Sequence, residues 1–427
     1  MVSPQAIARP GSSYSDVTSR VGSAKVTRDW EVAVLGSLVL SHNSGIYKKK
    51  ELYGRGSNII GVADFVNTKR IDGQLFDRVP LTSAEQARYT LRAGNLLYCE
   101  SSLVREGIAR TLFVTERGAG TAFAWHTRRY SIDKRRLNPA FLNYFLQSES
   151  ARHYLISSSI QTALTGINTR AYLGCPIVIP SLAEQNLIVE VLSDADALID
   201  SLEKIVEKKR LIKRGAMQDL LSGRRRLPGF EEQWIKKKVG DFTNCAAGGT
   251  PSTLVPDYWG GDILWMSSGE LHSKRVSDVQ GRITEKGLLE SSARIFPPYS
   301  VLIGLAGQGK TRGTVALNLV PLATNQSIAA IFPNPSYSSE FLYHNLSARY
   351  DELRELSAGD GGRGGLNLTL IRSIPILFPP LNEQTAIART LDDLDAELEA
   401  LEARLEKARQ IKQGMMQELL TGRVRLV

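Results

Sequence analysis

The 427-residue sequence has few cysteines and few histidines, and neither type is clustered. Its three cysteines, Cys99, Cys175 and Cys245, lie far apart and form no CxxC pair. This spacing excludes a disulfide framework and a cysteine zinc site, and it fits a protein of the reducing cytoplasm. The five histidines include neither an HExxH motif nor a pair four residues apart, so we expect no metal site.

Long hydrophobic runs are also missing. No stretch approaches the roughly 18 apolar residues of a membrane span, and the first residues lack the apolar core of a signal peptide. We therefore expect no membrane partner and a cytoplasmic location. Residues 1–29 are polar and rich in serine, which predicts a flexible leader before Trp30.

The sequence carries no catalytic signature that we recognise. It has no Asn-Pro-Pro-Tyr amino-methylation motif, no GxGxxG cofactor loop, no GxSxG elbow and no paired-carboxylate nuclease cluster. We therefore expect no catalytic residue and no cofactor, and we interpret the chain as a binding protein. Because 53 basic residues face 44 acidic ones, the formal net charge of +9 favours a polyanionic partner such as nucleic acid.

The most informative feature is an internal repeat. The stretch IPSLAEQ ending at Gln185 returns as FPPLNEQ ending at Gln384, 199 residues later. Without gaps, this offset aligns residues 179–227 with 378–426, and roughly 25 of the 49 aligned pairs are identical. Such self-similarity indicates two tandem copies of one unit, each a variable region followed by a near-constant segment.

The constant segments read as long helices. Apolar residues follow the heptad alternation of a coiled coil, interrupted in the second copy by Lys412. The residues of this stripe are Leu192, Ile199, Leu202 and Val206 in the first copy and Leu391, Leu394, Leu398, Leu401 and Leu405 in the second. Helices over about 183–221 and 382–420 would each be roughly 60 Å long. We expect the two helices to form an antiparallel pair; the alternative is that each packs on its own domain.

The variable regions combine short β-branched runs with Gly and Pro turns, for example at residues 58–62, 301–303 and 327–331, and a helix is predicted before each constant segment. The predicted fold is therefore mixed α/β (α+β): two tandem recognition domains separated by a long antiparallel two-helix coiled coil. The predicted segments after the leader are domain 1 at 30–178, helix 1 at 179–227, domain 2 at 228–377 and helix 2 at 378–427.

One string in the second region matches a nucleotide-binding motif. Residues Gly304–Thr311 fit the phosphate-loop pattern GxxxxGK[ST] and follow an apolar strand. The motif requires a helix to begin at Lys310 and Thr311, whereas the next residues read as a strand. The alternatives are a Gly-rich basic hairpin, in which Gln308, Lys310, Thr311 and Arg312 reach DNA, and an inert turn.

Other polar residues are candidates for DNA contacts because similar clusters occur in both variable regions. They are Lys48, Lys49, Lys50 and Arg55 in the first region, and Lys274, Arg275 and Arg363 in the second. A charge run is more often a solvated face.

These motifs together resemble the DNA specificity subunits of type I restriction-modification systems. The resemblance rests on IPSLAEQ and FPPLNEQ leading into long helices, on the endings MQDLLSGRRRLPGF and MQELLTGRVRL, and on GGTPSTLVPDYWGGDILWMSSGEL at residues 248–271. The opening of the first region, SHNSGIYKKKELYGRGSNIIGVADF, is less typical of that family.

The resemblance implies two target recognition domains, each reading one half of a split site on double-stranded DNA. It also implies two methyltransferase (modification) subunits as partners and, in the full complex, restriction and translocase subunits, to which catalysis belongs. Applied to this chain, the resemblance implies that two segments of the second domain are loops that face DNA. They are GQGKTRG and the GGTPS start, which contains Thr250 and Ser252. The coil faces would bind the methylating subunits.

Two other functions remain open from the sequence. One is a P-loop nucleotide hydrolase using Gly304–Thr311. The other is a coiled-coil scaffold whose variable domains bind proteins.

Overall fold

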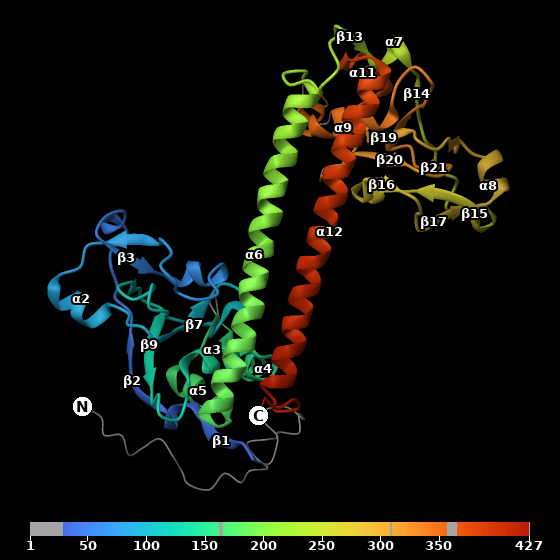
Figure 1. Cartoon of the computed structure of the whole chain (residues 1–427). Helices are drawn as coiled ribbons and strands as arrows, with labels where there is room; N and C mark the ends of the chain where they lie inside the picture. The colour runs from blue at the N-terminus through green and yellow to red at the C-terminus, as the bar shows by residue number, and fades with distance from the viewer. Residues whose placement is uncertain (1–28, 162–164, 308–309, 357–364, 427) are drawn as a thin grey trace. The chain divides into compact units, whose positions relative to one another are not determined.

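The computed structural model describes residues 29–161, 165–307, 310–356 and 365–426 (Figure 1). Most of the predicted leader and two predicted DNA contacts, Gln308 and Arg363, lie outside these residues. The chain forms two compact units. Unit 1 contains the chain up to Ser201 and again from Leu405, and unit 2 contains Leu202–Arg404.

Unit 1 is built around a four-stranded sheet of order β2-β9-β5-β7. Its strands are β2 (Val39–Ser44), β9 (Thr127–Ile132), β5 (Leu96–Cys99) and β7 (Thr111–Phe113). Smaller sheets have the orders β4-β3-β8, β10-β11-β6 and β1-β12. Their strands are β3 (Ser57–Ile60), β4 (Asp77–Val79), β8 (Ala122–Phe123), β6 (Ser101–Ser102), β10 (Ile160–Gln161), β11 (Thr165–Gly166), β1 (Glu31–Val34) and β12 (Pro176–Ile179). The short helices are α2 (Ser83–Tyr89), α3 (Pro139–Gln147), α4 (Glu149–Ser157) and α5 (Thr169–Leu173).

Unit 2 repeats this plan with a five-stranded sheet of order β14-β22-β19-β20-β16. Its strands are β14 (Cys245–Ala247), β22 (Ile328–Ile331), β19 (Val301–Gly304), β20 (Val315–Asn318) and β16 (Arg275–Val276). The other sheets, β17-β15-β21-β18 and β13-β23, comprise β15 (Trp259–Met266), β17 (Gly281–Ile283), β18 (Ile295–Phe296), β21 (Leu322–Thr324), β13 (Ile235–Lys238) and β23 (Pro375–Phe378). The short helices are α7 (Val239–Phe242), α8 (Glu285–Leu289), α9 (Ser339–Ala348), α10 (Tyr350–Leu356) and α11 (Leu368–Ser373).

The central strands follow from uninterrupted apolar runs. Every residue of β5, β19 and β22 is buried, as expected of strands covered on both faces. The helices α3 and α9, predicted before the constant segments, are preceded by the N-cap residues Asn138 and Ser338, whose side chains accept hydrogen bonds from backbone N–H groups of the first turn. The mixed α/β fold with two tandem copies is confirmed.

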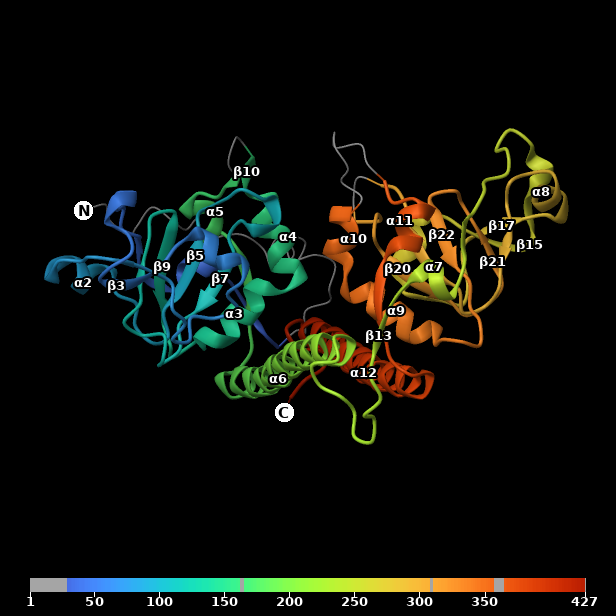
Figure 2. The same cartoon turned by 90° about the horizontal axis from the view of Figure 1, so that it is seen from above.

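The constant segments form the two long helices α6 (Leu182–Leu221) and α12 (Leu381–Leu419), drawn in green and red in Figure 1. Both are followed by a glycine with a φ of +71°, Gly223 and Gly422, and glycine adopts this left-handed conformation without strain. In each unit a part of α6 packs on a part of α12, which is also seen in Figure 2.

The direction of this packing is antiparallel. In unit 1, Lys412 Nζ donates to Asp196 at 2.6 Å. In unit 2, Lys209 Nζ donates to Glu397 at 2.8 Å, and Lys213 pairs with Asp395. Residue numbers thus fall on one helix as they rise on the other, and the predicted antiparallel helix pair is confirmed.

The heptad residues lie in this packing. Leu192, Ile199, Leu202, Val206, Leu391 and Leu405 are buried, and Leu394, Leu398 and Leu401 are half-buried. The rival expectation, that each helix packs on its own domain, holds at the helix ends, because Leu192 belongs to the core of unit 1 and Leu391 to the core of unit 2. The apolar side chains of the stripe pack within the fold, so they leave little apolar surface for a partner protein.

The repeated Glu-Gln pair joins each domain to its helix. Gln185 accepts from the backbone N–H of Asn138 at 2.7 Å, and Gln384 accepts from that of Ser338 at 3.0 Å. Each glutamine therefore ties the first turn of a long helix to the N-cap of the helix α3 or α9. All four Glu and Gln side chains of the two motifs are buried.

The glutamates make a second repeated contact. Glu184 accepts from Trp30 Nε1 at 3.2 Å and from Arg425 at 2.9 Å. Glu383 accepts from Trp234 Nε1 at 2.8 Å and from Arg226 at 2.6 Å. Each arginine also lies over the indole ring, at 5.5 Å in unit 1 and 5.3 Å in unit 2.

Among the described residues, no helix combines the length and the apolar character that crossing a bilayer requires.

Candidate nucleic-acid interface

Several loops of unit 1 meet at one edge of its main sheet. The strands β2, β5 and β8 end there and β9 begins there, as their pairing shows. Gly45 N donates to Thr127 O at 2.9 Å, and Glu100 N donates to His126 O at 2.8 Å. We name residues 45–50, 100–108 and 124–127 loop edge 1.

Loop edge 1 carries exposed aromatic side chains. Tyr47 and Trp125 are 65% and 51% exposed, and their rings meet edge to face with centroids 5.4 Å apart. The Trp125 ring also stacks on His126 at 4.2 Å. Large apolar rings left in water at a loop edge are typical of a binding surface rather than of a solvated face.

The basic residues predicted to contact DNA in unit 1 differ in two respects: whether they lie at loop edge 1, and whether they form an ion pair. Lys48 is mostly buried and donates to Glu85 at 2.7 Å. Lys49 and Lys50 are exposed and have no ion pair with any described residue. Arg55 is exposed but precedes β3, and only the carboxyl end of β3 lies at loop edge 1.

The same edge exists in unit 2. Gly248 N donates to Ile328 O at 3.0 Å, and Leu305 N donates to Ser327 O at 2.8 Å. We name residues 248–252, 305–307, 310–313 and 325–327 loop edge 2. The GGTPS start lies here: the Thr250 hydroxyl donates to Gln326 Oε1, and Ser252 is exposed.

The string that matches a phosphate loop is a hairpin loop. It joins β19 to β20, which pair antiparallel, and Gly313 N donates to Gly304 O at 2.9 Å to close it. No helix begins at Lys310; a strand follows instead, beginning at Val315. Because a phosphate loop needs amides at a helix N-terminus, this geometry does not fit the alternative of a P-loop nucleotide hydrolase. That the loop between the two strands contacts DNA stays a prediction.

The hairpin residues differ in exposure. Lys310 is exposed with no ion pair among the described residues, while Thr311 and Arg312 are half-buried. The Lys310 carbonyl accepts from Tyr350 at 3.0 Å, which ties the loop to α10. The ammonium of Lys310 is therefore presented at loop edge 2 on an anchored backbone.

The remaining predicted contacts of unit 2 lie elsewhere. Lys274 is exposed in the turn before β16. Arg275 pairs with Asp392 of α12 and lies 5.2 Å from the Tyr343 ring. Burial alone would raise the pKa of Asp392, but the hydrogen bond from His344 and the charge of Arg275 outweigh it and lower that pKa. The Arg275 guanidinium thus serves the contact between the domain and its helix.

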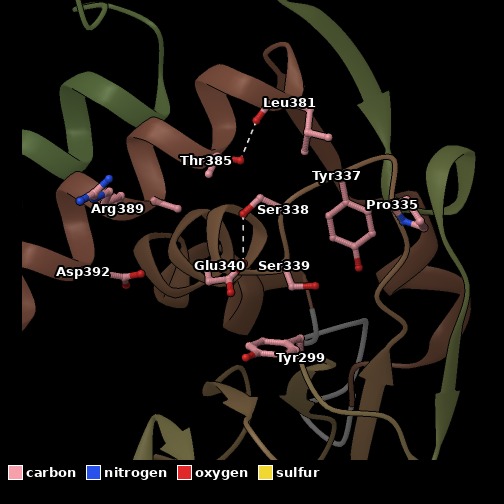
Figure 3. Close-up of a pocket in the computed structure, with 11 residues that line it drawn as sticks. Tyr299, Pro335, Tyr337, Ser338, Ser339, Glu340, Leu381, Thr385, Arg389 and Asp392 are labelled. Atoms are coloured by element: carbon pink, nitrogen blue, oxygen red, sulfur yellow. Dashed lines mark hydrogen bonds between the residues drawn. The ribbon is translucent and has the colours of Figure 1, made fainter.

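A groove of about 510 Å³ in unit 2 lies between α12 and the start of α9 (Figure 3). Its polar groups are largely satisfied within the fold: Thr385 donates to Leu381 O at 2.9 Å, and Ser338 donates to Glu340 at 3.2 Å. Tyr299, which lines it, precedes β19, so the groove lies away from loop edge 2. We assign it no reactive role. Among the described residues, no group of His, Cys, Asp and Glu could hold a metal ion.

The comparison with known families identifies the repeat. A family model described as the type I restriction modification DNA specificity domain matches residues 27–212 and, a second time, residues 231–410. The chain belongs to this family. Both copies of the specificity domain include one loop edge and the greater part of one long helix.

Individual relatives agree with the family assignment. The MjaIX specificity subunit of Methanocaldococcus jannaschii is 33% identical over 169 residues, which span 38% of this chain and 38% of that protein, well under two thirds of its length. The putative MjaX specificity subunit of the same organism is 21% identical, over 94% of this chain and 95% of that protein. The S subunit structure from M. genitalium has a TM-score of 0.61 at 15% identity, over 92% of this chain and 96% of that one, and shows a shared fold.

Three residues at the loop edges were not among the sequence-based candidates: Tyr47, Trp125 and Gln326. Searching for basic residues could not find them, because none carries a charge. A tryptophan with polar neighbours, as in AWHTRRY, is the one local signal that points to an exposed aromatic residue.

Proposed function

We propose that the chain is the DNA-reading subunit of a type I restriction-modification complex. Each unit recognises one half of a bipartite site on double-stranded DNA, and the helix pair carries two methyltransferase subunits and, in the full complex, restriction and translocase subunits. The chain itself is non-catalytic, needs no cofactor and acts in the cytoplasm, where the DNA and these partners are found.

One observation carries this proposal: the two units present equivalent loop edges that differ in side-chain chemistry. Loop edge 1 offers the aromatic rings of Tyr47 and Trp125, and loop edge 2 offers Thr250, Gln326 and an exposed lysine. Two copies of one scaffold with unlike contact groups suit a protein that reads two unlike sequences. A single ligand bound twice would need like groups.

We place the phosphate contacts on the exposed basic residues of the two edges. Lys49, Lys50 and Lys310 combine exposure with the lack of an ion pair to any residue that the structure describes. Gln308 and Arg363 stay in the proposed interface on the grounds of the sequence alone. Lys48 and Arg275 contribute less in this proposal, because each already neutralises a carboxylate.

The family names support the partners. The relatives are named specificity subunits of type I restriction enzymes, so those proteins act within larger enzymes. Each of the helices α6 and α12 is about 60 Å long at 1.5 Å per residue, and in this proposal their pairing sets the distance between two half-sites on DNA.

The test is a domain exchange in the full chain. Residues 30–165 are replaced by those of another family member, and the methylated sites of cells carrying the gene are sequenced. We expect one half of the site to change and the other half to stay. A change in both halves, or in neither, contradicts the proposal.

A second measurement separates DNA reading from protein binding. DNA affinity that depends on several phosphate contacts falls steeply with salt, by roughly 1,000-fold or more between 50 and 200 mM for six contacts or more. A salt-insensitive affinity for partners that contain no DNA would favour the protein scaffold instead.

A further inference from the structure

Backbone hydrogen bonds show which positions of the two loop edges are equivalent. Gly45 N donates to Thr127 O, and Gly248 N donates to Ile328 O. Both glycines are needed for the same reason, since a Cβ at Gly45 would lie 2.0 Å from Ala124 O and one at Gly248 would lie 2.1 Å from the Thr324 hydroxyl. These glycines start the same turn in both units.

The next bond keeps this register. Ile46 N donates to Phe123 O at 3.0 Å, and Gly249 N donates to Thr324 O at 2.9 Å. In unit 1, Trp125 lies two residues after the acceptor Phe123, and Tyr47 directly follows the donor Ile46. In unit 2, Gln326 lies two residues after the acceptor Thr324, and Thr250 directly follows the donor Gly249.

The same two positions are therefore in contact in both units, with different chemistry. In unit 1 they hold the edge-to-face pair Tyr47 and Trp125. In unit 2 they hold the hydrogen-bonded pair Thr250 and Gln326. We name these the paired positions.

We infer that the paired positions read the bases, and that their chemistry sets which base each unit prefers. This inference rests on the proposed function and adds the residues that discriminate. It assigns specificity to uncharged groups, whereas the lysines nearby bind phosphates, which carry no sequence information.

Gln326 matches one base in particular. Its Oε1 accepts from the Thr250 hydroxyl, which fixes the amide while leaving Oε1 a second lone pair. Its Nε2 has no hydrogen-bond partner in the part of the chain that the structure describes, and the side chain is exposed. An amide held in this way can bind adenine through N6 and N7 in the major groove, so unit 2 reads an A·T pair.

The aromatic pair has different partners on DNA. The ring faces of Tyr47 and Trp125 are apolar. The Tyr47 hydroxyl and the Trp125 Nε1–H are single polar groups, so neither side chain can make the two parallel hydrogen bonds that distinguish adenine or guanine. Apolar side chains discriminate in the major groove by contact with the thymine methyl group. We therefore assign the rings of unit 1 to a thymine.

The experiment selects duplexes from a pool randomised over about 20 base pairs, roughly two helical turns. The wild-type full chain is compared with Gln326→Ala, with the double variant Tyr47→Ala/Trp125→Ala, and with the control Gln233→Ala, an exposed glutamine that precedes β13. Because the substituted side chains are exposed, thermal unfolding should match wild type and show that each variant folds.

We expect Gln326→Ala to lose its preference for one A·T pair by roughly 10-fold or more in one half of the site, and to keep the other half. The double variant should lose a thymine in the opposite half. The control should enrich the wild-type sequence.

The two possible failures differ. If the wild-type chain enriches a bipartite sequence and the variants enrich it unchanged, the inference is overturned and the proposed function stands. If the wild-type chain enriches no sequence, the proposed function fails and the inference fails with it.

Discussion

Lys412 donates a hydrogen bond to Asp196, with 2.6 Å between Nζ and Oδ1, from a heptad position where an apolar residue is expected. Both side chains are more than four-fifths buried, and Tyr144 donates to the other carboxylate oxygen at 2.7 Å. The 199-residue offset maps this pair onto Lys213 and Asp395, which also pair. An irregularity of the sequence pattern is thus a repeated ion pair that fixes the register of the helices.

Removing one member of this pair should destabilise unit 1 strongly. Lys412→Ala leaves the buried Asp196 carboxylate without its cation, and such losses amount to about 3–5 kcal/mol. Hydrogen exchange of the amides in the core of unit 1 measures the loss. The exposed Lys407→Ala on the same helix should change little. A double variant Lys412→Met/Asp196→Leu should recover much of the stability. If its loss of stability equals the sum of the losses of the two single variants, the pairing is contradicted.

The Glu184 contact predicts a local effect at the chain ends. Glu184→Gln removes the charge that holds Arg425 and weakens the bond to Trp30. Charge-assisted hydrogen bonds are stronger than those between neutral groups, so residues 29–34 and 423–426 should exchange their amide hydrogens faster in this variant. The exposed Glu190→Gln is the matched control.

The equivalent change in unit 2 tests whether the repeat carries the same contact. Glu383→Gln should loosen Trp234 and Arg226 while leaving the exchange of unit 1 unchanged. Equal loosening of both units by either substitution would show that these contacts do not act locally.

The stability of unit 2 should depend on pH through Asp392. Burial opposes ionisation of this carboxyl, but the hydrogen bond from His344 at 2.7 Å and the charge of Arg275 lower its pKa below the ordinary value. An acid with a depressed folded pKa stabilises the fold above its unfolded pKa of about 3.9 and loses this contribution as the pH falls through the folded value.

The measurement is the unfolding temperature of the domain core of unit 2 between pH 6 and 3. Asp392→Asn should lower it at pH 6 and flatten its decline in acid. The exposed Asp393→Asn should retain the wild-type decline. An unchanged profile in Asp392→Asn would mean that another group controls the acid response.

The helices could be predicted because their signals are local. A heptad and a 199-residue repeat are readable along the chain, and the predicted limits differ from α6 and α12 by a single residue at most ends. The loop edges could not be predicted in the same way, since Tyr47 and Trp125 meet only through strand pairing between distant segments.

The charge of a side chain does not show in the sequence whether an acidic residue neutralises it in the fold. In the sequence, nothing distinguishes Lys48 and Arg275 from the exposed Lys49 and Lys310. In the fold, Lys48 pairs with Glu85, and Arg275 pairs with Asp392. Which cations stay free depends on acidic residues 37 and 117 positions away, respectively, and that pairing has no local signature.

The length of the helix pair should set the spacing of the DNA half-sites. Deleting residues 395–401 removes seven residues from α12 alone and leaves Lys209 and Lys213 without their partners. We expect this variant to unfold more readily and to select no defined spacing. If residues 207–213 are deleted as well, the opposite segment of α6 is also removed, and the register of the ion pair between Lys412 and Asp196 is restored.

The double deletion should therefore fold, with a helix pair shorter by about 10 Å. Since one turn of DNA is about 34 Å for 10 base pairs, the selected half-sites should stay the same while the gap between them shortens by about three base pairs. Selection from the randomised duplex pool gives both results at once. Altered half-sites at an unchanged gap would mean that the helices influence base choice and do not act as the spacer.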